Sequence, residues 1–172
     1  EWNYIHAPTC RDAIRAKVEW FFEQLQHIYD ILHRAIQRGF EPIIALELPK
    51  SCSYWTTPKM ESFMSSFSMR SVHVDGCAFG LVAQFGHHAV HPIKKPWTIA
   101  SNNPVFLGAF PRLCRCPKGT KHVPCAGRET KPTENYPSEF TRDVHGLFHY
   151  IVSNHLSKRK YDNHHHAWHP VA

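Results

Sequence analysis

The run Pro42-Ile43-Ile44-Ala45-Leu46-Glu47-Leu48-Pro49 decides the interpretation of the fold. It is short, nearly continuously apolar and bounded by proline at both ends. Such a run is typical of a β-strand that is buried on both faces, as strands of parallel sheets are. We therefore expect a buried strand over residues 42–49.

A long amphipathic helix is predicted just before this strand. Thr9 is a suitable N-cap and Gly39 a suitable residue to end the helix. Between them, apolar residues recur in steps of three and four, which places them on one helical face. The stripe consists of Ile14, Val18, Phe21, Leu25, Ile28, Leu32 and Ala35. We expect this stripe to be a packing face, with a coiled-coil partner as the alternative.

Helix and strand patterns continue to alternate after the first strand. Thr57-Pro58 places proline at the first helical position, and the helix should run to about Phe67. Residues 70–75 predict the next strand, and shorter candidates lie at 81–84 and 97–100. This alternation predicts an α/β fold of three layers, with a small, mostly parallel, Rossmann-like sheet and flanking helices.

The composition is that of a folded protein. The chain has 172 residues, of which 42% are hydrophobic, enough to bury a core. It contains no run of about 18 uncharged apolar residues, so no membrane span is predicted. The chain does not begin with Met and opens with no signal-peptide pattern, so we expect a processed product or a fragment.

Four parts are predicted along the chain. We expect an α/β domain over residues 1–110, a Cys/His module over 111–135, a C-terminal helix over 136–154 and a basic, His-rich tail over 155–172. The module contains few large apolar residues and many Pro, Gly, Lys and Arg residues. It therefore needs a source of stability other than a hydrophobic core.

The sharpest chemical signal is Cys114-x-Cys116-x5-His122-x2-Cys125. Three thiols and one imidazole within twelve residues can form a tetrahedral site for a structural zinc ion. Zinc binding would also supply the folding free energy that this segment lacks. The alternatives are free thiols in a loop or a disulfide to Cys125.

Positive charge accumulates beside this motif. The net charge of the chain is +6, and clustered cations favour a polyanion such as nucleic acid. A solvated basic surface that serves solubility is the alternative. The residues predicted to hold phosphates are Lys94, Lys95, Arg112, Arg115, Lys118 and Lys121.

Two carboxylates and two thiols follow the predicted strands. Glu47 lies near the end of the first strand and Asp75 ends the next. In open parallel sheets, ligands bind at the carboxyl ends of strands, so both acids are candidate catalytic residues, or alternatively turn caps. Cys52 and Cys77 would need a nearby base to act as nucleophiles and are more typical of buried thiols. Such free thiols favour a reducing intracellular compartment, nuclear or cytoplasmic.

Histidines are abundant, with 15 in the chain. His145 and His149 are spaced four apart on the last predicted helix, but no Glu follows His145 as a metalloprotease motif requires. Two other groups of histidines could bind a metal ion, but we interpret them as flexible or exposed side chains. They are His87, His88 and His91 in the central loop, and His164, His165, His166 and His169 in the tail.

Three short motifs in order suggest a family. They are Leu46-Glu47-Leu48-Pro49, Val74-Asp75-Gly76-Cys77-Ala78-Phe79-Gly80 and Lys94-Lys95-Pro96-Trp97-Thr98-Ile99-Ala100. This order resembles the C-terminal half of the cytosine-C5 DNA methyltransferase-like domain, particularly a diverged form found in retroelement polyproteins. In that form a Lys-Lys-Pro-Trp strand precedes a Cys/His knuckle and a Tyr-Pro helix. The likeness spans roughly residues 40–150.

The resemblance implies roles for some residues and excludes one activity. It implies that Glu47 contacts a base and that the strand carrying Lys94 and Lys95 faces nucleic acid. The family binds S-adenosylmethionine through a Gly-rich loop and attacks the base with a Cys in a Pro-Cys loop. Neither motif is present in that setting here, so S-adenosylmethionine binding and methyl transfer by this chain alone are not expected.

The leading hypothesis is a zinc-containing, nucleic-acid-associated domain that is not catalytic alone. The alternative is a non-catalytic accessory subunit of a larger assembly, which would suit the long apolar helix stripe and the tryptophans at both ends, Trp2 and Trp168. A third hypothesis is an intact enzyme that uses Cys52 or Cys77. Protein partners are expected under the second hypothesis, and binding to a polyanion under the first.

Overall fold

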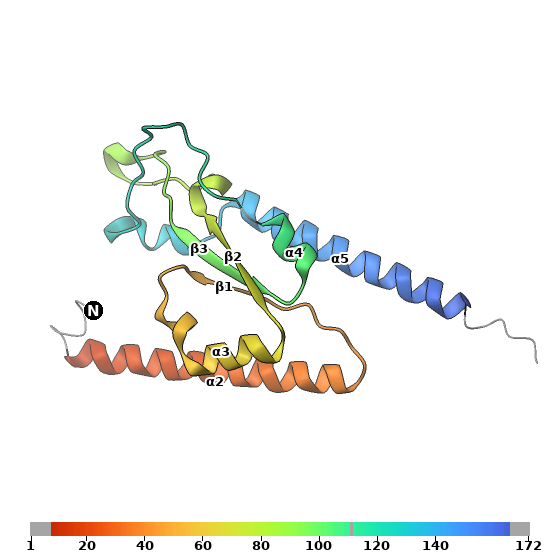
Figure 1. The fold of residues 1–172 in the computed structure, drawn as a ribbon. Helices are drawn as coiled ribbons and strands as arrows, with labels where there is room; N and C mark the ends of the chain where they lie inside the picture. Colours follow the sequence, from red (N-terminus) through yellow and green to blue (C-terminus); the bar gives the residue numbers. More distant parts are fainter. Residues whose placement is uncertain (1–7, 111, 166–172) are drawn as a thin grey trace, which may run out of the picture. The chain divides into compact units, whose positions relative to one another are not determined.

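The computed structural model describes residues 8–110 and 112–165. The chain forms two compact units (Figure 1). The first contains the chain up to Ile43 together with Ser53–Phe67, and the second contains Ile44–Cys52 and the chain from Ser68 onward. The sheet, the Cys/His segment and the last helix therefore belong to the same unit.

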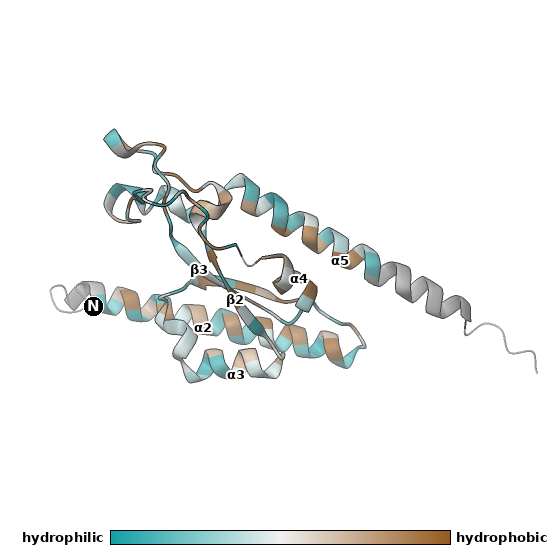
Figure 2. Cartoon of the chain, turned by 45° about the horizontal axis from the view of Figure 1, so that its top comes forward, coloured by the Kyte–Doolittle hydropathy of each residue, from teal (hydrophilic) through white to brown (hydrophobic). Residues whose placement is uncertain are grey.

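The first unit is a pair of helices. Helix α2, Pro8–Gln37, confirms the predicted long helix, and hydrophilic and hydrophobic residues alternate along it (Figure 2). Gly39 ends it with a φ of 80°, a left-handed conformation that glycine adopts without strain. Leu25 from the predicted stripe is buried, as is Phe22 beside the stripe, whereas Ile28 of the stripe is 47% exposed.

Helix α3 follows the prediction at both ends. It spans Pro58–Ser66, and the Thr57 side chain accepts a hydrogen bond from the Met60 N–H. A short 3-10 helix, η1, spans Ser53–Thr56 before it. Aromatic rings join these elements, since Tyr54 packs 4.8 Å from Phe21, measured between ring centroids.

The second unit is built on a three-stranded sheet. The strands are β1, Ala45–Pro49; β2, Arg70–Asp75; and β3, Pro96–Ser101. Their order is β1-β3-β2, and β3 pairs antiparallel with both neighbours. β3 is the most buried strand of the three, which fits its central position.

The prediction of a mostly parallel, Rossmann-like sheet is wrong, because every pairing is antiparallel. The prediction failed for a topological reason. Since β1 and β2 both run opposite to β3, they point the same way, as strands joined through a helix usually do. They are not neighbours, however, because β3 inserts between them and takes the hydrogen bonds that a parallel pair would have made.

Two helices pack against the sheet in this unit. α4, Pro104–Ala109, was not predicted, because Asn102-Asn103-Pro104 had indicated a break. Asn103 instead caps the helix by accepting the Phe106 N–H at 2.9 Å, and Pro104 begins it. The last helix, α5, spans Ser138–His165 and continues beyond the predicted end at residue 154. Phe140 of α5 lies 5.5 Å from Trp97 of β3, measured between ring centroids.

The remaining connections contain short 3-10 helices and few strand contacts. These helices are η2, Gly76–Phe79; η3, Gly86–His88; η4, Gly127–Glu129; and η5, Pro132–Glu134. The strand predicted over 81–84 is reduced to one bridge, between Val82 and Pro92. Among the residues described, no helix is both long and apolar enough to span a bilayer.

Candidate metal centre

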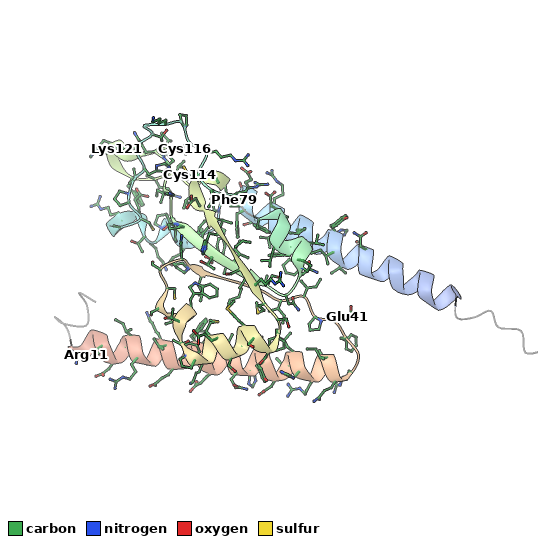
Figure 3. The ribbon with its side chains drawn as sticks, viewed as in Figure 1. Arg11, Glu41, Phe79, Cys114, Cys116 and Lys121 are labelled. Atoms are coloured by element: carbon green, nitrogen blue, oxygen red, sulfur yellow. The ribbon has the colours of Figure 1, made fainter. Side chains whose placement is uncertain are left out.

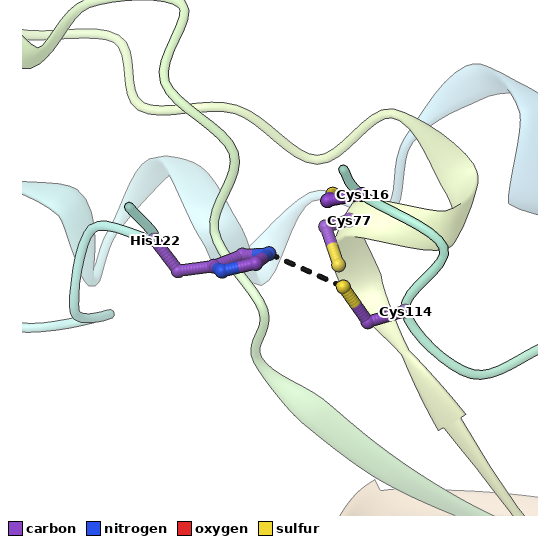
Figure 4. A group of neighbouring side chains, drawn as sticks. All are labelled: Cys77, Cys114, Cys116 and His122. Carbon is purple, nitrogen blue, oxygen red and sulfur yellow. Dashed lines mark hydrogen bonds between the residues drawn. The ribbon is translucent and has the colours of Figure 1, made fainter. Parts of the chain in front are cut away.

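Four side chains from two segments converge beside the sheet. The ligand atoms of Cys77, Cys114, Cys116 and His122 all lie within 4.8 Å of one another. In Figure 4 the sulfurs of Cys77 and Cys114 approach each other, and the imidazole of His122 faces them. Cys114 Sγ lies 3.4 Å from His122 Nε2. These four residues, which we call the Cys3His cluster, could bind a metal ion.

The spacing of the cluster suits a tetrahedral metal site. Zinc binds sulfur at about 2.3 Å and imidazole nitrogen at about 2.0–2.1 Å, so a tetrahedral S–N edge measures about 3.5 Å and an S–S edge about 3.8 Å. The observed distance between Cys114 Sγ and His122 Nε2 is 3.4 Å. A metal ion would therefore require shifts of about an ångström or less in the other ligand atoms.

Cys77 reaches the cluster because β2 ends in a tight turn. Gly76 directly follows the strand, and its N–H donates to the carbonyl of Lys94 at 2.6 Å. A Cβ at this position would lie 2.7 Å from Leu81 Cδ2 and 3.3 Å from the Lys95 carbonyl oxygen. The backbone thus approaches closely where only glycine fits, and this approach sets Cys77 at the start of η2.

Asp75 orients the other half of the cluster. Its side chain is buried, and its Oδ2 accepts the backbone N–H of Cys114 at 2.9 Å. Its own N–H donates to the Arg112 carbonyl at 2.9 Å. Asp75 therefore positions the backbone of Cys114 beside Cys77, and its assignment as a candidate catalytic residue stays a prediction.

The segment that supplies the other ligands is held at its turn. Gly119 adopts a φ of 90°, and Thr120 N–H donates to the Pro117 carbonyl at 3.0 Å, which reverses the chain between Cys116 and His122. Val123 N–H then donates to the Pro92 carbonyl at 3.0 Å. The turn returns His122 to the sulfurs, as the sequence had indicated.

The structure places Cys77 in the cluster and Cys125 outside it. Cys125 Sγ lies 3.0 Å from the hydroxyl of Thr133, a buried residue. The predicted ligand set thus keeps Cys114, Cys116 and His122 but exchanges its fourth member. The exchange follows from the topology. The end of β2 brings the Cys77 thiol to the other three side chains, whereas the chain beyond His122 leads Cys125 away to Thr133.

All thiols whose surroundings are described are free. They are Cys52, Cys77, Cys114, Cys116 and Cys125. Burial, with the neighbouring thiols, raises the pKa of Cys77 to about 12 in the absence of a metal. The backbone N–H of Cys116 lowers the pKa of Cys114. Metal coordination requires thiolates, so binding would release protons from such residues.

Arg112 serves the fold and is not free to bind phosphate. Its Nη1 lies 2.9 Å from Glu139 Oε1, and its Nη2 lies 2.8 Å from Asp143 Oδ2. Its guanidinium also lies 5.0 Å from the centre of the Phe79 ring. These contacts fasten the Cys/His segment to α5, which corrects the prediction for Arg112.

The two lysines before β3 differ in how fully their ammonium groups are bound by other residues. Lys95 Nζ donates to the Thr133 carbonyl and lies 5.9 Å from the Trp97 ring centre. Lys94 Nζ lies 3.8 Å from Asp75 Oδ2, and its side chain is 55% exposed. Lys95 is therefore largely committed to the fold, whereas Lys94 keeps access to solvent.

The remaining cations of the segment are exposed. No hydrogen bond or ion pair within the described ranges joins the side chains of Arg115, Lys118, Lys121 or Arg128 to other residues. We call these four residues the cation set. Figure 3 shows Lys121 near Cys114 and Cys116 at the same end of the unit.

Glu129, by contrast, is buried and hydrogen-bonded to the backbone. Its two carboxylate oxygens accept the N–H groups of Gln84 and Phe85, each at 2.9 Å. It thus clamps the loop after η2 onto the loop that carries the cation set. Because both oxygens accept backbone N–H groups, Glu129 makes no ion pair with the exposed cations of the described segment.

Glu47 lies apart from the Cys3His cluster. The Tyr136 hydroxyl donates to Glu47 Oε2, while Oε1 is buried without a partner among the described residues. Burial raises the pKa of Glu47, against the opposing effects of Tyr136 and Lys95. β3 separates Glu47 from Asp75, so the two acids do not form one site.

Other residues singled out in the sequence either lie outside the Cys3His cluster or fall outside the described part of the chain. His87, His91, His145 and His149 are not in the cluster. His166, His169, Trp2 and Trp168 lie outside the described residues, as do the side chains of Cys10, His88, His164 and His165.

Comparisons of the chain with protein-family models, curated proteins and solved structures found no match.

Proposed function

We propose that this chain is a zinc-stabilised nucleic-acid-binding protein that has no catalytic activity by itself. The observation that carries the proposal is the contrast between the exposed cation set and the inward-facing Glu129 on one segment. Three of the four members of the Cys3His cluster, namely Cys114, Cys116 and His122, lie in that segment. One bound ion would therefore fix the positions from which the cations reach a ligand.

Zinc is the ion that suits the donor set best. Three thiolates and one imidazole form a common structural zinc site, and four protein ligands leave no open position for catalysis. Harder cations such as Mg²⁺ and Ca²⁺ prefer oxygen ligands. The proposed role of the ion is therefore structural, and the segment around it depends on the ion for its fold.

Nucleic acid is the ligand that suits the cation set best. Lys and Arg side chains on a small rigid loop contact phosphates without reading sequence. If the four cations each neutralise one phosphate, the log-log dependence of affinity on salt should have a slope between about −3 and −4. Affinity should then fall roughly 100-fold between 50 and 200 mM salt.

The test measures binding of labelled DNA and RNA oligonucleotides by fluorescence anisotropy as salt is raised. Lys118→Gln and Lys121→Gln should each lower the salt slope by about one unit. Lys17→Gln, an exposed lysine on α2, is the matched control and should leave the slope unchanged. Affinity that does not vary between 50 and 200 mM salt contradicts the proposal.

The resemblance to cytosine-C5 methyltransferases remains a hypothesis. The sheet is antiparallel, and the comparisons do not support a family. The proposed binding therefore rests on the cations and the Cys3His cluster, and no base contact is assigned to Glu47.

An accessory-subunit role is a second candidate, favoured by one observation. Several large apolar side chains of α2 are exposed, namely Trp20, Ile28, Ile31 and Ile36. Exposed aromatic and aliphatic groups of this kind mark protein interfaces. A stable complex with another protein, together with no affinity for oligonucleotides, would favour this candidate over the first.

A further inference from the structure

A cleft of about 590 Å³ lies where β1 ends and β3 begins. It is lined by Pro49, the last residue of β1, by Ser51 just after that strand and by Pro96 at the start of β3. Val123 and Pro124 also line it. The volume falls within the range of about 300–1,000 Å³ that ligand sites usually have, and such sites are mostly apolar with a few polar groups.

The charged groups of the cleft are arranged for an anion. Lys94 and Lys95 both line it. Lys94 is the available cation, because it is 55% exposed and its distance of 3.8 Å from Asp75 Oδ2 is long for an ion pair. Glu134 is the acid of the cleft, and Lys131 Nζ lies 2.6 Å from its Oε2. The cleft therefore offers positive charge to a ligand.

His122 connects the cleft to the Cys3His cluster. It is a member of the cluster and also lines the cleft. The residues that follow it, Val123 and Pro124, are part of the same wall. A metal ion on His122 would therefore hold this wall in place, and the cleft and the cation set would depend on the same ion.

We propose that the cleft binds one nucleotide unit, with its phosphate at Lys94 and its ring against Pro49, Pro96 and Pro124. This inference rests on the proposed function, since the same strand would continue over the cation set. The rings of the three prolines offer an apolar C–H surface that can pack against the face of a base, and the hydroxyls of Ser51 and Thr130 can donate to or accept from the sugar. The ligand class is a 5′-phosphorylated nucleoside, either free or within a strand.

The first experiment measures binding of adenosine 5′-monophosphate to the zinc-loaded full chain by NMR titration. We expect shifts at Ser51, Lys94 and Val123, and weaker binding of adenosine and of inorganic phosphate, because each lacks one half of the ligand. Equal binding of inorganic phosphate and the nucleotide would overturn the assignment of a base to the cleft.

The second experiment uses variants that alter the cleft without touching the cation set or the cluster. Ser51→Trp should fill the cleft and weaken both nucleotide and oligonucleotide binding, because the indole would occupy the space of the base. Lys94→Gln should weaken them without adding bulk, so it answers the question even if Ser51→Trp fails to fold. Ser65→Trp, at an exposed serine of α3, is the control.

The outcomes separate this inference from the proposed function. Salt-dependent oligonucleotide binding that responds to Lys118→Gln but not to Ser51→Trp or Lys94→Gln would overturn the cleft alone. Nucleotide binding that needs Lys94, with no affinity for oligonucleotides, would support the cleft and overturn the proposed function. Loss of both kinds of binding in the cleft variants, with zinc content unchanged, is the expected result.

Discussion

Asp75 Oδ2 accepts the backbone N–H of Cys114 at 2.9 Å, and this bond ties the end of β2 to the first ligand of the second segment. Asp75 lies two residues before Cys77, so one buried carboxylate lies behind ligands from both segments. Carboxylates in this position orient ligands and tune metal sites. Removing this carboxylate should therefore lower the affinity of the cluster for zinc.

Asp75→Asn should weaken zinc binding about 10- to 100-fold, the usual effect of losing such a supporting group. The amide cannot offer a charged acceptor to the Cys114 N–H. Competition with a chromophoric zinc chelator measures the change. Asp30→Asn is the control, since Asp30 is exposed on α2. Equal zinc affinity in the Asp75→Asn variant and the wild type would show that Asp75 only fills space.

Arg112→Ala should lower stability by about 1 kcal/mol, because two partly exposed ion pairs are lost. The salt slope of oligonucleotide binding should stay that of the wild type, because Arg112 is committed to Glu139 and Asp143. Urea unfolding measures the change in stability, and fluorescence anisotropy of labelled oligonucleotides measures the salt slope. A slope lowered by one unit would instead return Arg112 to the phosphate-binding residues.

Glu129→Gln should destabilise the clamp by about 1–3 kcal/mol, because one buried backbone N–H would face an amide NH₂ in place of an oxygen. Hydrogen exchange at the amides of Gln84 and Phe85 reports this directly. We expect both to exchange faster in the variant. Unchanged protection at both amides would exclude a clamping role for Glu129.

Glu47 should make stability fall as pH rises. Burial raises its pKa in the folded state above the ordinary value of 4.5. Between these two values the folded state binds more protons than the unfolded state, so stability is greatest below about pH 4.5 and declines through the raised pKa. Glu47→Gln should remove this decline, since an amide oxygen can still accept from Tyr136. Urea unfolding of both proteins between pH 4.5 and 7 tests the difference.

Local sequence signals predicted most elements of the fold but not their pairing. Thr57 and Gly39 act through neighbouring backbone groups, and these two signals gave correct helix ends. The predicted N-cap Thr9 was wrong, because α2 begins one residue earlier at Pro8. The direction of β1 relative to β2 also followed from the helix between them. The central position of β3 depends on long-range pairing of Trp97–Ser101, which no local pattern encodes.

The candidate site was likewise predicted only as far as residues close in sequence determine it. Spacing along one loop found Cys114, Cys116 and His122, but it favoured Cys125 over Cys77 because Cys125 is close in sequence. Only the end of β2 brings Cys77 to the others. A signal was present, since Gly76 before Cys77 indicated a tight turn directly after a strand. Charge alone likewise could not distinguish Arg112, which is ion-paired, from exposed Lys118.

The central claim is that Cys77, and not Cys125, completes a zinc site that holds the cationic segment. Elemental analysis of purified Cys77→Ser and Cys125→Ser proteins, after dialysis against a weak chelator, tests it most directly. We expect one zinc per chain for the wild type and Cys125→Ser, and loss of zinc in Cys77→Ser. Zinc retained in Cys77→Ser but lost in Cys125→Ser would contradict it, as would a wild-type protein that binds no zinc.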